Sequence, residues 1–272
     1  MVKKKKINLL NLAEKSKKRC LKYRKEILSL SQKMSALHIA PAFSCIEIVD
    51  YIYSNFINKK RNDLFIMSKG HASIIQYLIL YERGQIKKKD IENFCKPPSI
   101  LGTHPDFGTP GINASTGSLG HGAGLAVGRA YAKKILKQRG NIICLLSDGE
   151  LQEGSTWEAI MMAANKKLNN LVFFIDNNDF SGLERMSISH KAFYPLNKKF
   201  SSFGWETHNI DGHNFNEIDK CFKKKQIKPK VIICKTIKGK GVSFMENVPI
   251  WHYRSPNKKE FSIAIEELNN EK

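Results

Sequence analysis

The strongest structural signal in the chain lies in residues 141–179, which read NIICLLSDGELQEGSTWEAIMMAANKKLNNLVFFIDNND. The apolar runs 141–146 and 171–175 are typical of buried parallel strands. The segment between them, 154–167, is expected to form a helix. A single crossover of this kind places the two strands side by side or nearly so. Polar residues follow both strands, at the edge where open α/β sheets bind their ligands.

Further elements of the same class are expected outside this unit. We expect helices at 21–33, 44–57, 72–83 and 122–136, and a third strand at 230–235. Ser44 suits the N-cap of its helix, and the helix at 72–83 is apolar enough to be largely buried. A Gly- and Pro-rich loop at 101–122 is long for a compact domain, and such loops usually carry function. The sequence therefore predicts an α/β fold with a mostly parallel sheet and helices on both faces.

The chain of 272 residues is long enough to bury a large core. No internal repeat and no Pro- or Ser-rich linker divides it. We expect a basic N-terminal segment at 1–20, one ligand-binding domain at 21–265 and a C-terminal tail at 266–272.

Composition and charge narrow the class of protein. The apolar fraction of 42% does not suggest disorder, and no apolar run approaches the ~18 residues of a membrane span. The net charge of +20 raises the question of a nucleic-acid or membrane partner. The lysines lie in dispersed clusters without a nucleic-acid motif, so we expect neither partner. The six cysteines form no C-x-x-C pair, which indicates free thiols and a cytoplasmic location.

Asp148 and Asn178 each follow one strand of the first unit, so the crossover should bring them together. They offer a carboxylate and an amide oxygen, which are hard ligands suited to Mg²⁺ that also binds phosphate oxygens and water. A main-chain carbonyl just past Asn178 could complete the set. Gly149 allows close backbone approach, and the following helix N-terminus favours a phosphate. The alternative is an ordinary Asp-Gly turn beside an unrelated Asn-rich loop.

The order Ser147-Asp148-Gly149, followed about thirty residues later by Asn177-Asn178, resembles the G-D-G and N-N signature of thiamine-diphosphate enzymes. Ser147 replaces the first glycine, but both metal-binding side chains are present. Six stretches in the same order resemble the transketolase family in particular. They are ALH at 36–38, SKGHAS at 68–73, GTHPD at 102–106, TGSLGHG at 116–122, DGELQEG at 148–154, and KTIKGKG at 235–241 with WH at 251–252.

The resemblance implies catalytic roles for three histidines. His38 and His252 would handle the C3 hydroxyl of a sugar substrate, and His104 would hold its C1 hydroxyl. Imidazoles suit such tasks near neutral pH. His252 is followed by Tyr253, where the family usually has glycine. The three histidines outside the matched stretches are expected to be packed or solvated residues: His190, His208 and His213.

The resemblance also implies thiamine diphosphate and Mg²⁺ as cofactors. Asp148, Asn178 and the Phe180 carbonyl would bind Mg²⁺, and the His71 side chain would contact the diphosphate. The cofactor-binding residues would be His71, Gly117, Ser118, Leu119, Gly149, Glu150 and Asn178. His121 would lie near the cofactor without a catalytic role.

The reaction implied is transfer of a two-carbon ketol unit from a ketose phosphate to an aldose. A complete transketolase is more than twice as long and contains a pyrimidine-binding domain that this sequence lacks. The chain therefore resembles the N-terminal subunit of a split transketolase, active only with a partner chain that carries that domain, in a heterotetramer. Glu153 and Glu158 would lie at an interface between cofactor sites, or they are ordinary acids near a helix N-terminus.

Two alternatives remain open at this point. The chain could belong to another thiamine-diphosphate enzyme, for example as the α-subunit of a 2-oxo-acid dehydrogenase. It could also be a non-catalytic relative that uses the same fold for association. The retained Asp148, Asn178 and four matched histidines favour an active enzyme, and the sequence does not name its sugar substrates.

Overall fold

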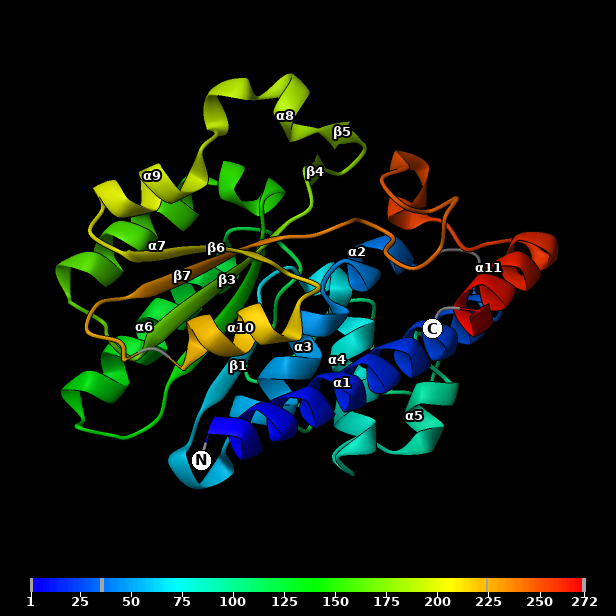
Figure 1. Ribbon diagram of the computed structural model, residues 1–272, viewed down its shortest axis with the longest axis horizontal. Coiled ribbons are helices and arrows are strands. Elements are labelled where there is room, and N and C mark those ends of the chain that lie inside the picture. The colour runs from blue at the N-terminus through cyan, green and yellow to red at the C-terminus, as the bar shows by residue number, and fades with distance from the viewer. Residues whose placement is uncertain (1, 35–36, 224, 271–272) are drawn as a thin grey trace.

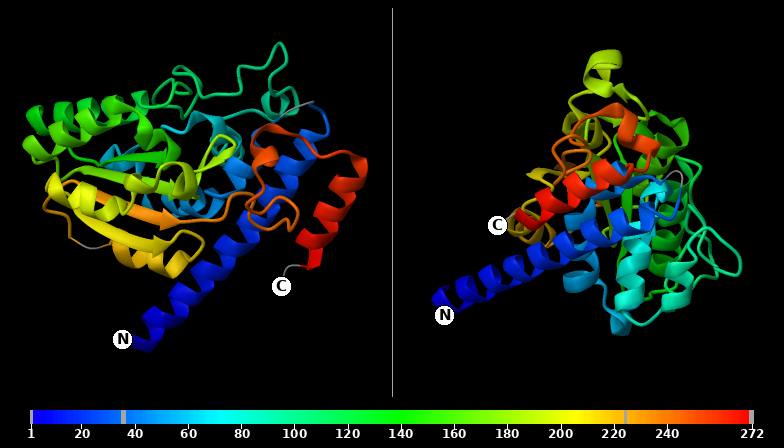
Figure 2. Two further views of the ribbon diagram at one scale, coloured as in Figure 1. Left: turned by 90° about the horizontal axis from the view of Figure 1, so that it is seen from above. Right: turned by 90° about the vertical axis from the view of Figure 1, so that its right-hand side faces the viewer.

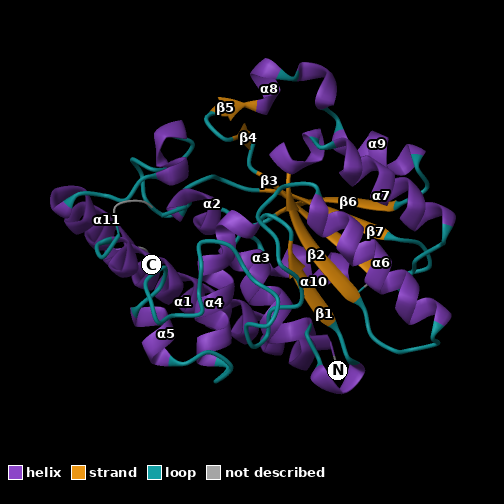
Figure 3. Ribbon diagram, turned by 180° about the vertical axis from the view of Figure 1, so that it is seen from behind, coloured by secondary structure: helices purple, strands orange, loops and turns teal. Residues whose placement is uncertain are grey.

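The computed structural model describes residues 2–34, 37–223 and 225–270, and its centre is a five-stranded sheet with the order β1-β2-β3-β7-β6. Every neighbouring pair in this sheet is parallel (Figure 3). The three strands expected from the sequence are β2, β3 and β7. The strands are β1 (Leu64–Met67), β2 (Ile142–Ser147), β3 (Leu171–Asn177), β6 (Glu206–Asp211) and β7 (Lys230–Lys235), with a small antiparallel pair, β4 (Phe180–Ser181) and β5 (Glu184–Arg185).

Helices surround the sheet and precede or follow most of its strands. The α-helices are α1 (Val2–Ser31), α2 (Ile39–Phe43), α3 (Ile46–Tyr51), α4 (Ser73–Glu82), α5 (Lys88–Glu92), α6 (His121–Ile135), α7 (Gly154–Asn165), α8 (Met186–Ser189), α9 (Leu196–Ser202), α10 (Phe215–Phe222) and α11 (Lys258–Asn270). The crossover α7 joins β2 to β3 as expected. The apolar helix α4 is largely buried, which was also expected.

Both faces of the sheet are covered by helices, as predicted (Figure 1). Successive strand residues point to opposite sides, so Phe174 and Phe173 of β3 belong to different cores. One core includes residues of α1, α3, α4, α10 and α11, and the other includes residues of α6, α7 and α9. Burial on both sides explains why β2 and β3 read as continuous apolar runs.

Helix α1 is a single helix of 30 residues whose N-terminal end extends past the body of the protein (Figure 2). It continues through residue 20, and Cys20 is buried in the core. Helix α11 likewise continues through residue 265, and Leu268 is fully buried. Met1 of the expected N-terminal segment and residues 271–272 of the expected tail lie outside the described residues.

Among the helices of the described ranges, none combines the length and apolar character needed to cross a bilayer. All six cysteines are free thiols, and five of them are buried, whereas Cys95 is exposed. Burial raises the pKa of the Cys144 and Cys234 thiols well above the usual value. These buried thiols therefore act as packing groups in the core.

The region 44–57 differs from the single helix that its pattern predicts. It contains α3 followed by a π-helical segment, Ile52–Phe56, and α3 begins after the N-cap residue Cys45. The expected cap was wrong: Ser44 follows the last residue of α2, and its hydroxyl donates to Asp176 Oδ2 at 2.5 Å. A tertiary contact has taken the side chain that the local pattern assigned to a cap.

Two strands were not expected from the sequence. Strand β1 has only four residues, which is short for recognition by pattern. Strand β6 reads ETHNID, and it has one buried residue because it forms an edge of the sheet. Polar edge strands lack the apolar signal that identifies central ones.

Asp176, near the end of β3, connects several segments at the carboxyl edge of the sheet. Its fully buried carboxylate accepts hydrogen bonds from the Lys69 ammonium and the Thr236 hydroxyl. It also accepts from Ser44, and from the Asn178 amide at 3.1 Å. Burial opposes ionisation, but Lys69 and these donors keep the pKa of Asp176 below its usual value. The ends of α2, β1, β3 and β7 are therefore tied to one charge.

We predict that Asp176→Asn destabilises the protein by about 3–5 kcal/mol, because it leaves the buried Lys69 ammonium without its counter-charge. Urea unfolding monitored by circular dichroism measures the change. Glu92→Gln is the control, since its ion pair with Lys88 is exposed to solvent and contributes about 0.5 kcal/mol or less. Equal and small effects of the two substitutions would contradict a central role for Asp176.

Candidate active site

The carboxyl ends of β2 and β3 bring Asp148 and Asn178 to one turn, as the crossover predicts. The two strands are hydrogen-bonded neighbours. An Asp148 carboxylate oxygen accepts from the backbone N–H of Asp179 at 2.6 Å, and Asn178 Oδ1 accepts from that of Phe180 at 3.1 Å. Oxygens of both side chains therefore face the backbone of residues 178–180, where two metal ligands would have to lie.

Asp148 is a buried carboxylate that forms no ion pair within the described residues. Burial, together with the nearby Asp176 carboxylate, raises the pKa of Asp148 to about 8. The backbone N–H groups of Gly149 and Asp179 donate to it but bring no net charge. A bound cation would stabilise the ionised form of such a carboxylate, so the charge of the site fits a metal ion.

The Phe180 carbonyl lies beside the same turn. A Cβ atom on Gly149 would be only 3.2 Å from this oxygen, so glycine permits the close approach of the two backbones. A carboxylate, an amide oxygen and a backbone carbonyl are ligands that Mg²⁺ accepts alongside phosphate and water. The part of the chain that the structure describes has no cluster of three His, Cys, Asp or Glu side chains suited to a metal, and this ligand set does not require one.

A cavity of about 170 Å³ adjoins this turn. Six of the predicted site residues line it: His71, Leu119, Gly149, Asn178, Phe180 and His252. They come from the beginning of α4, the loop before α6, the ends of β2 and β3, and the segment before α11. The structure therefore brings together residues that are up to 181 positions apart, from His71 to His252.

Four histidines from the matched stretches gather around His38. The ring centroids of His71 and His252 lie 5.4 Å from that of His38, and the ring centroid of His104 lies 6.2 Å from it. The prediction that these four side chains share one site is therefore consistent with their positions. Ala36, from the same matched stretch as His38, lies outside the described residues.

The histidines of this cluster are held neutral. Burial is the main cause that lowers the pKa of His38 to about 4 and that of His252 to about 3. Burial also lowers the pKa of His71 well below its usual value. Nδ1 of His38 is buried and has no hydrogen-bond partner in the described ranges. Such an unsatisfied atom is open to a ligand.

The loop before α6 places its predicted residues differently from one another. Gly117 has φ +144°, and a Cβ there would lie 2.8 Å from Cγ of His104, so only glycine fits against this ring. Ser118 is exposed and does not line the cavity. Glu150 is buried below the loop, and its carboxylate accepts from the backbone N–H of Gly120 at 3.0 Å. Glu150 thus supports the loop, whereas Leu119 reaches the cavity.

Lys238 is a site residue that the motifs alone did not single out. Its ammonium lies 3.0 Å from Nδ1 of His252 and 4.6 Å from the centre of the Phe180 ring, and it lines the cavity. Burial and the nearby Lys69 lower the pKa of Lys238 to about 8. A buried cation with no carboxylate partner among the described residues is suited to an anionic ligand. The signal was present in the KTIKGKG stretch, but a lysine among 45 basic residues does not stand out.

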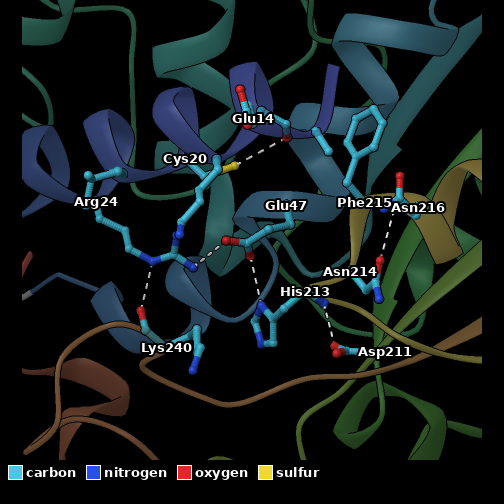
Figure 4. Close-up of a pocket in the computed structure, with 14 residues that line it drawn as sticks. Glu14, Cys20, Arg24, Glu47, Asp211, His213, Asn214, Phe215, Asn216 and Lys240 are labelled. Carbon is cyan, nitrogen blue, oxygen red and sulfur yellow. Dashed lines mark hydrogen bonds and ion pairs between the residues drawn. The ribbon is translucent and has the colours of Figure 1, made fainter. Parts of the chain in front are cut away.

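The segment that carries Lys238 is anchored by groups from α1, α3 and the loop before α10 (Figure 4). Nε2 of His213 accepts from the backbone N–H of Ile237 at 2.9 Å, while Nδ1 lies 2.9 Å from the Glu47 carboxylate. Arg24 pairs with Glu47 at 2.7 Å and donates to a backbone carbonyl of the same segment at 2.8 Å. His213 is thus a packed residue, as expected, and it supports the site from behind.

Comparison with known proteins agrees with this geometry. Residues 32–261 match the family described as "Transketolase, thiamine diphosphate binding domain". The chain is 33% identical over 260 residues to one of the named subunits of apulose-4-phosphate transketolase from Phocaeicola vulgatus, covering 91% of this chain and 92% of that one. It is 37% identical over 208 residues to human transketolase, which covers 76% of this chain but only 33% of the human one.

A solved structure is similar as well. Transketolase from Campylobacter jejuni superposes with a TM-score of 0.85 at 29% identity, over 95% of this chain and 42% of that chain. The chain therefore belongs to the transketolase family and corresponds to its thiamine-diphosphate-binding domain. Transketolases are transferases, so this chain is part of a transferase.

We predict that Lys238→Met weakens binding of thiamine diphosphate about tenfold or more, because a charge-assisted hydrogen bond contributes about 1.5–3 kcal/mol. Titration calorimetry in the presence of Mg²⁺ measures the dissociation constant. Lys235→Met is the matched control, since Lys235 is exposed at the end of β7 and does not line the cavity. A similar loss of affinity in both variants would mean that the effect comes from net charge alone.

The neutral histidines also predict a pH dependence of stability. The pKa of His38 is about 4 in the folded protein and 6.5 in its ordinary state, so between these values only the unfolded chain is protonated there. The free energy of unfolding should therefore fall as pH decreases through this window. His38→Asn should lessen the fall between pH 7 and pH 5 by about 1 kcal/mol, after allowance for partial exposure. Urea unfolding at the two pH values measures it, and an unchanged difference would contradict the neutral state.

Proposed function

We propose that this chain is the cofactor-anchoring subunit of a transketolase-like enzyme that moves a two-carbon ketol unit from a ketose phosphate to an aldose. The observation that carries this proposal is the placement of Asp148 and Asn178 at one turn, beside a cavity that adjoins the histidine cluster. Membership of the transketolase family supports it. Neither rival from the sequence, another thiamine-diphosphate enzyme or a non-catalytic relative, is favoured by a specific observation.

The charges at the cavity suit a metal diphosphate. Burial disfavours the charged form of Asp148 and also that of Lys238, so each group gains from a ligand of opposite charge. In our proposal Mg²⁺ is bound by Asp148, Asn178 and the Phe180 carbonyl, and the diphosphate is contacted by His71 and Lys238. A metal bound to a diphosphate presents both charges at once, which neither ion alone would do.

Bound thiamine diphosphate supplies the carbanion that attacks the substrate carbonyl and holds the electron pair released when C2–C3 breaks. The protein must then accept the proton of the C3 hydroxyl and hold the remaining hydroxyls. We assign the C3 hydroxyl to His38 and His252, and the C1 hydroxyl to His104. Neutral imidazoles can accept such protons, and the low pKa values of His38 and His252 keep both rings in that form.

The proposal includes a partner chain. This chain spans about a third of human transketolase, and the name of its relative in Phocaeicola vulgatus describes one subunit of an enzyme. We infer that a second polypeptide supplies the pyrimidine-binding domain and that two copies of each chain form a heterotetramer. Glu153 and Glu158 are exposed near the beginning of α7, which leaves them available for an interface between cofactor sites.

The substrates proposed are sugar phosphates. The names of two relatives refer to apulose 4-phosphate, so this ketose joins xylulose 5-phosphate as a donor to be tested. We keep the expectations of a cytoplasmic location and of no nucleic-acid or membrane partner as proposals. Their support is the free cysteines and the dispersed lysines.

Asp148→Ala is expected to abolish binding of thiamine diphosphate that depends on Mg²⁺, because it removes the only carboxylate among the proposed ligands. Calorimetric titration of the purified chain, alone and with its partner chain, measures the binding. Asp211→Ala is the control, since Asp211 ends a strand of the same sheet but is exposed and distant from the cavity lining. Unchanged binding by Asp148→Ala would remove the metal assignment.

The reaction itself is tested with the reconstituted complex. With either ketose phosphate as donor and an aldose as acceptor, we expect ketol transfer only when both chains, thiamine diphosphate and Mg²⁺ are present. Chromatography of the sugar products measures it. Binding of the cofactor without transfer from either donor would contradict the proposed substrates, and no binding in any combination would favour a non-catalytic role.

A further inference from the structure

Tyr253 lies against the histidine that stands at the centre of the candidate active site. Its ring centroid is 4.4 Å from that of His38, with 42° between the planes. This distance is shorter than any between His38 and the other three histidines. Tyr253 is also 54% exposed, so its ring covers one side of His38 while it faces the space outside the cluster.

The surrounding structure fixes the backbone on both sides of Tyr253. Trp251 is buried and packs against Phe244, with ring centroids 5.2 Å apart. Arg254 donates to both carboxylate oxygens of Glu260 at 2.7 and 2.9 Å, and its guanidinium lies 4.3 Å from the centre of the Trp251 ring. These contacts hold the segment before α11 in place, so the position of the Tyr253 ring is set by the fold.

The Tyr253 hydroxyl forms no hydrogen bond with any residue in the described ranges. Its ring makes the contact with His38, and no polar contact within these residues explains the choice of tyrosine over phenylalanine. Nδ1 of His38 is the unsatisfied buried atom of the cluster. A substrate that reaches His38 must therefore pass close to an aromatic ring whose main effect there is to occupy volume.

We propose that Tyr253 is a specificity-determining residue whose ring selects compact aldose acceptors of two or three carbons over five-carbon aldose phosphates. The inference rests on the proposed function, because His38 is there assigned to the C3 hydroxyl, and C3 derives from the aldehyde carbon of the acceptor. A ring beside His38 restricts the space next to C3 and C4. A short acceptor ends before this restriction, whereas a longer one must extend past the ring.

The test compares two acceptors in the complex of this chain with its partner, thiamine diphosphate and Mg²⁺, using the ketose phosphate donor that the wild-type complex accepts. The acceptors are glycolaldehyde and ribose 5-phosphate, and kcat/KM is measured for each. Tyr253→Gly should raise the ratio of kcat/KM for ribose 5-phosphate over glycolaldehyde about tenfold, which is the scale of steric discrimination in a pocket. Tyr253→Ala should raise it in the same direction without added backbone flexibility.

Tyr253→Phe is the matched control and should leave the ratio within about twofold, because the ring remains. An unchanged ratio in both Tyr253→Gly and Tyr253→Ala overturns the inference, while the proposed function stands. A change in Tyr253→Phe as large as that in Tyr253→Gly also overturns it, since the hydroxyl would then be responsible. Absence of ketol transfer by the wild-type complex overturns the proposed function, and this inference falls with it.

Discussion

The buried carboxylate of Asp176 holds together the edge of the sheet at which the candidate site is built. Its partners come from segments far apart in the chain: Ser44 after α2, Lys69 after β1, Asn178 after β3 and Thr236 after β7. An ionised carboxylate in a water-free interior needs several donors and a counter-charge. The chain meets this requirement in only one arrangement, and that arrangement also sets the positions of the residues next to each donor.

Those neighbours are the proposed ligands. Asn178 donates to Asp176 through its amide nitrogen, which leaves its oxygen directed to the turn where Asp148 lies. Thr236 precedes the segment that brings Lys238 to the cavity. Groups behind a metal site commonly orient the ligands in this way. The interior pair of Lys69 and Asp176 compensates its own charge, whereas Asp148 and Lys238 depend on a ligand for theirs. Binding of a metal diphosphate should therefore also stabilise the fold.

Much of this arrangement could be predicted from the sequence, and the reasons are physical. The strands β2, β3 and β7 are buried on both faces, so their composition identifies them, and the crossover rule then places Asp148 beside Asn178. The four histidines were found by resemblance to a family, since a single histidine has no pattern of its own. Leu119 reaches the cavity as implied, but Ser118 and Glu150 do not line it.

What the sequence could not provide depends on contacts between distant segments. Ser44 has the local features of a helix cap, yet a carboxylate 132 positions away takes its hydroxyl. Lys69 and Lys238 are two lysines in a lysine-rich chain, and only their burial distinguishes them. Strand β6 is polar because it lies at an edge of the sheet, and that position is a property of the assembled fold. Tyr253 attracted notice as a departure from the family, but its contact with His38 needed coordinates.

The central claim is that three oxygens at one turn bind a divalent ion that in turn binds the diphosphate. A crystal structure of the complex with thiamine diphosphate and Mn²⁺ in place of Mg²⁺ tests it, because the anomalous signal of manganese locates the ion directly. The account predicts one peak about 2.1 Å from an Asp148 oxygen, Asn178 Oδ1 and the Phe180 carbonyl, with diphosphate oxygens completing the coordination. A peak elsewhere, or a bound diphosphate whose metal has no contact with Asp148, would contradict it.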